Sequence, residues 1–82
     1  MSELGLSAQQ CRMARAALDW TTLQLADAAQ VGVTTVIRFE GGQTAPNRAT
    51  LAALRRSLED AGVEFIPENG GGVGVRLRDR SK

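Results

Sequence analysis

The chain has 82 residues, the size of one small domain, and a formal net charge of only +1. Its single cysteine and its lack of histidine exclude an internal disulfide and the usual zinc-ligand sets. The sequence also lacks paired carboxylates or a Ser/Lys arrangement that would act as a general base, so we expect no enzyme, no cofactor and no metal. No run approaches about 18 apolar residues, and the N-terminus lacks a basic region followed by an apolar run, so we expect a soluble cytoplasmic protein without membrane partners.

The first predicted helix covers Ser7 to Asp19. Ser7 and Gln10 have the spacing of a capping box, in which each side chain bonds the other residue's backbone N–H. Its apolar residues recur at helical intervals: Ala8, Cys11, Ala14 and Leu18. Cys11 is interpreted as a core thiol, because small and apolar residues surround it in the sequence.

A second capping box, Thr21 with Gln24, predicts a helix over residues 22–29. Gln30 to Gly32 interrupt the pattern, and Gly32 is suited to cap a third helix over residues 33–40. In that helix Val36 and Phe39 lie three residues apart and are expected to face inward. The following pair of glycines, 41–42, ends it.

Asn47 is the predicted N-cap of a fourth helix that ends at Gly62, the expected C-cap glycine. Its apolar stripe is Leu51, Leu54, Leu58 and Ala61. The period then changes to alternation, which predicts strands over residues 63–66 and 73–77 joined by a glycine-rich turn at 67–72. We therefore expect a mostly α fold: a four-helix domain at residues 1–62, a β-hairpin at 63–78 and a flexible tail at 79–82.

The helices at 22–29 and 33–40 are joined by only three residues, which predicts that they cross at a steep angle and leave part of the second exposed. A small residue at Ala26 fits a close crossing. The ordered series of residues here resembles the Xre-type helix-turn-helix family of phage repressors and Cro proteins. The resemblance runs from about Gln10 to Leu58, and it implies that the four helices of residues 1–62 form a repressor-like helix-turn-helix domain. The matching residues are 25–29 (LADAA), Val31, 34–42 (TTVIRFEGG), Pro46 and 50–51 (TL).

The resemblance implies an ion pair between Arg15 of the first helix and Glu40 at the end of the recognition helix. It also implies that the recognition helix, residues 33–40, enters the major groove of double-stranded DNA. The implied base contacts are Val33, Thr34, Ile37 and Arg38. The implied phosphate contacts are Thr21, Thr22, Thr35, Gln43, Thr44, Asn47 and Arg48.

Two positions depart from the family pattern. The turn has Gln30 where relatives have glycine, and the recognition helix starts from Gly32 where relatives have serine or threonine. The exposed face also carries Val33 and Ile37. Arg38 is suited to a bidentate contact with guanine, and the aliphatic side chains to thymine methyl groups, so modest or methyl-directed specificity is expected.

The predicted hairpin has two interpretations. In the first, it packs on the fourth helix of its own chain through Phe65 and Leu77. In the second, its edge pairs with another subunit and places two recognition helices in successive major grooves. The candidate dimerisation residues are Val63, Phe65, Val73, Val75 and Leu77. A dimer is expected because a single module buries little DNA surface.

The sequence thus predicts a bacterial transcriptional regulator that binds double-stranded DNA as a homodimer. The C-terminal hairpin sequence resembles that of a subgroup of small Xre-type regulators. Repression is expected over activation, because the sequence shows no activating patch and no ligand-sensing domain. Two alternatives remain open. One is an antitoxin whose hairpin binds a toxin, and the other is an adaptor whose Val33 and Ile37 meet a protein partner.

Overall fold

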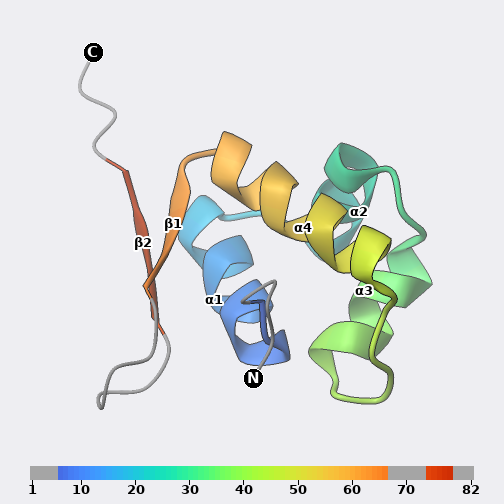
Figure 1. Cartoon of the computed structure of the whole chain (residues 1–82). Coiled ribbons are helices and arrows are strands. Elements are labelled where there is room, and N and C mark those ends of the chain that lie inside the picture. Colours follow the sequence, from blue (N-terminus) through green and yellow to red (C-terminus); the bar gives the residue numbers. More distant parts are fainter. Residues whose placement is uncertain (1–5, 67–73, 79–82) are drawn as a thin grey trace.

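The computed structural model describes residues 6–66 and 74–78, and within them four helices precede a two-stranded antiparallel sheet (Figure 1). The mostly α fold with a C-terminal hairpin that the sequence predicts is confirmed. The helices are α1 (Ala8–Leu18), α2 (Thr22–Ala29), α3 (Val33–Glu40) and α4 (Arg48–Asp60), and the strands are β1 (Val63–Ile66) and β2 (Gly74–Leu77).

Side chains just ahead of the helices determine where three of them begin. The Ser7 hydroxyl accepts the Gln10 N–H at 3.0 Å, and the Gln10 side chain accepts the Ser7 N–H at 3.1 Å. The Thr21–Gln24 pair does the same at 3.1 and 2.8 Å, so both predicted capping boxes are present. At α4 the Asn47 side chain accepts the Thr50 N–H at 2.8 Å. These bonds satisfy donors that have no partner within the helix.

The first two helices both end on a non-glycine residue in the left-handed conformation. Asp19 and Gln30 each have φ of 61°. At Gln30, where relatives in the resembled family have glycine, this is the conformation that glycine adopts at least cost. At α4 the left-handed residue is Gly62, with φ of 114°, directly after the C-cap.

All four helices and β1 contribute to one core. The predicted inward residues Val36 and Phe39 of α3 are 0% and 7% exposed. The buried apolar residues are Leu6, Cys11, Ala14, Leu25, Ala26, Ala29, Val36, Phe39, Leu54, Leu58 and Val63. Because Val63 belongs to this set, the hairpin shares the core of the helices.

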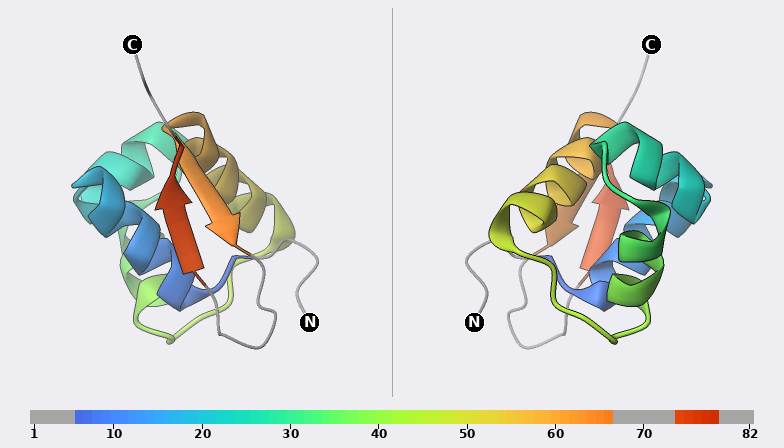
Figure 2. Two further views of the ribbon diagram at one scale, coloured as in Figure 1. Left: turned by 90° about the vertical axis from the view of Figure 1, so that its left-hand side faces the viewer. Right: turned by 90° about the vertical axis from the view of Figure 1, so that its right-hand side faces the viewer.

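The hairpin covers one side of α1 and α4 (Figure 2, left). Val63 pairs with Leu77 and Phe65 with Val75, so these four side chains lie on one face, with Glu64 and Arg76 on the other. The packing of Phe65 against the core is as expected. Leu77, however, is 43% exposed, and Val75 packs inward instead. Val73, the turn at 67–72 and the tail at 79–82 lie outside the described residues.

The hairpin and α3 lie at opposite ends of the molecule (Figures 1 and 2). The molecule measures 33 × 32 × 19 Å along its principal axes. None of the helices in the described part of the chain has the length and apolar character needed to cross a bilayer.

Candidate functional site

The pair α2 and α3 forms a compact two-helix unit at the end of the molecule away from the hairpin (Figure 2, right). The Val31 N–H donates to the Ala26 carbonyl at 3.0 Å and closes the short turn between the helices. Ala26 is 2% exposed, as a small residue at a close helix crossing should be. The unit therefore has little freedom to change the angle between its helices.

The two faces of α3 differ sharply. Val36, Phe39 and Glu40 are 0%, 7% and 6% exposed and hold the helix against the core. Thr34, Ile37 and Arg38 are exposed, and Val33 is half-buried and packs partly against the core. Of the four residues that the resemblance assigns to base contact, three thus face solvent together, and the fourth lies at the margin of that face.

The C-terminal end of α3 is fastened to α1 through the buried Glu40. Arg15 donates to both carboxylate oxygens, from Nε to Oε2 at 2.9 Å and from Nη2 to Oε1 at 2.7 Å. The ion pair expected between these residues is therefore present, in the bidentate form that suits a guanidinium. Cys11 Sγ also donates to Oε2 at 3.2 Å, and Arg12 Nη1 donates to the backbone carbonyl of Glu40. We call these four residues the Glu40 cluster.

The cluster also shifts two pKa values. The hydrogen bonds that Arg15 donates to Glu40 raise the pKa of Arg15, which keeps the guanidinium charged. Burial raises the pKa of the Cys11 thiol far above its ordinary value, and the hydrogen bond to Glu40 adds to the effect. Cys11 is thus a protonated core thiol, because burial and the hydrogen bond to Glu40 outweigh the charges of Arg15 and Arg12, which favour the thiolate that a nucleophile requires.

The roles of Cys11 and Arg12 in this cluster were missed by the sequence-based prediction. A signal was available, because Cys11 and Arg15 are four residues apart and therefore share a face of α1. The interpretation of Cys11 as a core thiol predicted its burial correctly but did not include its hydrogen bond to Glu40.

The candidate phosphate contacts lie on three segments. Thr21 and Thr22 begin α2, Thr35 is half-buried in the first turn of α3, and the remaining four lie between α3 and the first turn of α4. The Gln43 N–H donates to the Arg38 carbonyl at 2.9 Å, which folds this loop back onto α3. The exposed members of the set are Thr21, Gln43, Thr44, Asn47 and Arg48.

Two of these exposed residues already have a structural role. The oxygens of Thr21 and Asn47 accept backbone N–H groups as helix caps. At α2 the capping box occupies the N–H groups of Thr21 and Gln24. Those of Thr22 and Leu23 come too early in α2 to bond within it.

Most of the candidate dimerisation residues that the structure describes pack against the core of their own chain. Val63 is 1% exposed, and Phe65 and Val75 pack against the core. Of the described members only Leu77 presents a large exposed apolar surface. The other three side chains therefore stabilise the fold of the single chain, and they are not available as an apolar surface for a second subunit.

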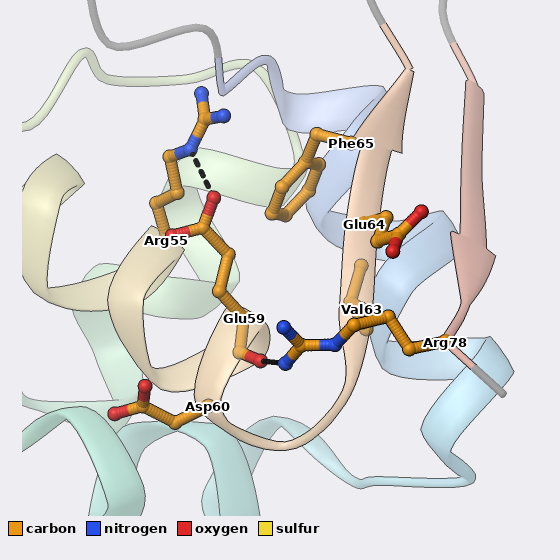
Figure 3. A pocket seen from close by; sticks show the side chains of 7 residues that line it. All are labelled: Arg55, Glu59, Asp60, Val63, Glu64, Phe65 and Arg78. Carbon is orange, nitrogen blue, oxygen red and sulfur yellow. Dashed lines mark hydrogen bonds and ion pairs between the residues drawn. The ribbon is translucent and has the colours of Figure 1, made fainter. Parts of the chain in front are cut away.

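A hollow between α4 and the hairpin is bordered mostly by charged residues, two of which form an ion pair (Figure 3). Arg55 Nε donates to Glu59 at 2.9 Å, and the Arg55 guanidinium lies 5.0 Å from the centre of the Phe65 ring. Arg78 donates to the backbone carbonyl of Glu59 near the end of α4. Within residues 6–66 and 74–78 no group of acidic residues or cysteine is arranged to hold a metal ion. The contacts around the hollow thus connect the hairpin to α4.

Comparison with known proteins adds no family to these findings. No protein-family model matches the chain, and a search of curated proteins finds no match.

Proposed function

We propose that this chain is a sequence-specific DNA-binding regulator of the Xre-type helix-turn-helix class, in which α3 enters the major groove. The observation that carries the proposal is the division of α3 into two faces. The buried face holds the helix in the core, while Thr34, Ile37 and Arg38 face solvent. The major groove of B-DNA admits an α-helix, and side chains on its outer face then reach the base edges.

The exposed side chains suit base recognition. The Arg38 guanidinium has the geometry for two hydrogen bonds to O6 and N7 of guanine, and the Thr34 hydroxyl donates or accepts. The Glu40 cluster supports this role indirectly. Because it fixes the C-terminal end of α3, the three side chains are presented on a helix that does not need to be ordered on binding.

The proposed phosphate contacts flank α3. The Thr22 and Leu23 N–H groups at the start of α2 are suited to an anion, since the helix dipole adds positive potential there. Arg48, exposed at the start of α4, is a cation on the other side of the loop. Each neutralised phosphate adds about 0.9 to the slope of affinity against salt on logarithmic axes. A steep slope therefore supports DNA binding, and a protein adaptor predicts a shallow one.

The proposal includes a homodimer that acts as a repressor in the bacterial cytoplasm. With eight residues, α3 is about 12 Å long, so one helix covers only a half-site. Two-fold related half-sites are the common solution for regulators of this size. Repression then results from occupation of the operator.

Selection from a pool of random duplexes tests the proposed function. The wild type is expected to enrich one motif, and Arg38→Ala to lose the preference for one guanine, with a cost of about 1 to 3 kcal/mol at that position. Arg56→Ala is the matched control, because it removes an exposed arginine from α4 instead of α3. It should recover the wild-type motif. The proposal is wrong if the wild type enriches no motif. The assignment of Arg38 is wrong if Arg38→Ala recovers the same motif at equal strength.

A further inference from the structure

Ile37 is an exposed apolar side chain in the middle of α3. Four large apolar residues of the described chain are well exposed, namely Leu23, Ile37, Ile66 and Leu77, and Ile37 is the one on α3. It is 53% exposed, although its neighbours Val36 and Phe39 are buried. Its surface thus makes little contribution to the chain's own core and is available to a ligand.

The outer side of α3 consists of two parallel rows. Residues four apart in a helix lie one above the other, so Thr34 and Arg38 form a polar row, and Val33 and Ile37 form an apolar row beside it. Val33 packs partly against the core. The outward contact of the apolar row is therefore made by Ile37, directly beside Arg38.

Charge indicates what this surface binds. Arg38 is the exposed charged side chain of α3, while the acid of the same helix, Glu40, is 6% exposed and paired with Arg15. The two rows therefore present one cation and no carboxylate. A polyanion that carries apolar groups next to hydrogen-bond acceptors is complementary to such a surface. The major groove of duplex DNA is such a polyanion, with pyrimidine methyl groups beside guanine O6 and N7.

The geometry of neighbouring residues narrows the target further. Ile37 and Arg38 are separated by about 100° around the helix and 1.5 Å along it, so they reach neighbouring bases, which are stacked about 3.4 Å apart. Ile37 is β-branched and has few rotamers in a helix. It therefore offers a preformed apolar surface that loses little side-chain entropy on contact.

From this juxtaposition we infer that Ile37 recognises the 5-methyl group of a pyrimidine adjacent to the guanine bound by Arg38. The site selected by the chain then contains a pyrimidine and a guanine side by side, and the pyrimidine is thymine or 5-methylcytosine. This inference rests on the proposed DNA binding and adds the chemical class of the target.

Replacement of single thymines by uracil in the selected duplex tests the inference. This change removes the 5-methyl group and leaves every hydrogen-bonding group of the base in place. At the thymine beside the guanine, wild-type affinity is expected to fall about fourfold, the value of one buried methyl group. At the other thymines, replacement by uracil should leave the affinity unchanged.

A second series compares cytosine with 5-methylcytosine at the sensitive position. Tighter binding of 5-methylcytosine shows that the methyl group is read on either base, whereas a response confined to thymine assigns thymine as its source.

Three variants connect the effect to the side chain. In Ile37→Ala the difference between thymine and uracil should disappear, and circular dichroism should show an intact fold because position 37 is on the surface. Arg38→Ala should lose the guanine preference and keep the thymine–uracil difference. Ile66→Ala is the matched control, since it truncates another isoleucine, 38% exposed on β1 at the end of the molecule away from α3, and it should keep both preferences.

The outcomes separate this inference from the proposed function. Failure of the wild type to select any duplex overturns the proposed function itself. Selection of a clear motif with equal affinity for thymine and uracil at every position overturns the inference alone. It is also overturned if Ile37→Ala keeps the fourfold difference, because another side chain then reads the methyl group.

Discussion

At the scale of single residues, the buried Glu40 does most to fix the orientation of α3. Burying a carboxylate is unfavourable unless its oxygens receive hydrogen bonds. Here Arg15 and Cys11 together make three such bonds. Since these groups belong to α1, the end of α3 cannot turn without breaking them. The position of Arg38 on α3 thus depends on α1 residues that lie outside the proposed set of base contacts.

The thiol of Cys11 predicts how stability changes with pH. The chain has no histidine and no tyrosine, and its one lysine is Lys82, so Cys11 is the side chain that ordinarily titrates near pH 9. In the unfolded chain the thiol ionises there, while in the folded protein its raised pKa keeps it protonated. The unfolded state therefore binds fewer protons above pH 9, and stability falls as pH rises. We expect a loss of about 1.4 kcal/mol at pH 10 relative to pH 7.

Urea unfolding between pH 7 and pH 10, with reductant present, measures this loss. Cys11→Ala is the control, because it removes the ionising group and should show a flat profile over the same range. For each protein the change in the free energy of unfolding between pH 7 and pH 10 is compared. This change does not depend on the packing that the variant loses at both pH values. Equal slopes in both proteins would contradict the assignment to Cys11.

At the scale of elements, the helix boundaries follow from local chemistry. Capping boxes depend on residues three apart, so the starts of α1 and α2 can be predicted from the sequence at Ser7 and Thr21. The end of α2 is different. Gln30 takes a left-handed conformation that costs a non-glycine residue about 1 to 2 kcal/mol, and it does so because Val31 must return to the core. Tertiary packing here overrides the local preference.

Gln30→Gly is therefore expected to stabilise the protein by about 1 kcal/mol, after the greater freedom of glycine in the unfolded chain is allowed for. Thermal or urea unfolding checks the sign. Gln9→Gly is the matched control, since Gln9 is an exposed position within α1 where the same substitution should destabilise. Destabilisation by both substitutions would mean that the turn is not strained at Gln30.

The contrast between local patterns and tertiary packing explains how much of the fold and the site could be predicted from the sequence. The helices, the hairpin and the inward face of α3 depend on periodicity and caps, and the structure has them where they were expected. The exposure of Leu77 and the hydrogen bond of Cys11 to Glu40 depend on which element lies opposite. No local pattern encodes that. The expected contacts of Arg38 and its neighbours with DNA remain predictions, although the structure gathers Thr34, Ile37 and Arg38 on one face.

At the scale of the whole molecule, the position of the hairpin constrains any dimer. Its inner side chains complete the core, and its outer face carries the Glu64–Arg76 ion pair, with an N–O distance of 2.9 Å. Among its described residues the large exposed apolar side chains are Ile66 and Leu77, which lie on opposite faces and at opposite ends of the hairpin. Because α3 lies at the opposite end of a molecule 33 Å long, a dimer joined through hairpins places the two α3 helices at its outer ends. Such a dimer favours half-sites more than one helical turn apart, about 34 Å.

Removal of the chain after Ile66 is not a usable test of this interface. It deletes β2, which pairs with β1 and packs on α1, so Val75 leaves the core and the truncated protein is expected to unfold. A charge at Leu77 is expected to leave the core intact, because Leu77 is 43% exposed and is not among the residues that pack against the core.

Leu77→Glu is therefore expected to weaken the proposed dimer by about tenfold or more, because two copies bring an unpaired carboxylate to the same apolar contact. Sedimentation of wild type and variant over a range of concentrations measures the shift. Leu23→Glu, which places the same charge at an exposed apolar site on α2, should sediment like the wild type. If the wild type sediments as one chain at concentrations that saturate a selected duplex, the dimer is wrong. If Leu77→Glu associates as strongly as the wild type, the hairpin is not its interface, and half-sites one turn apart become compatible with the fold.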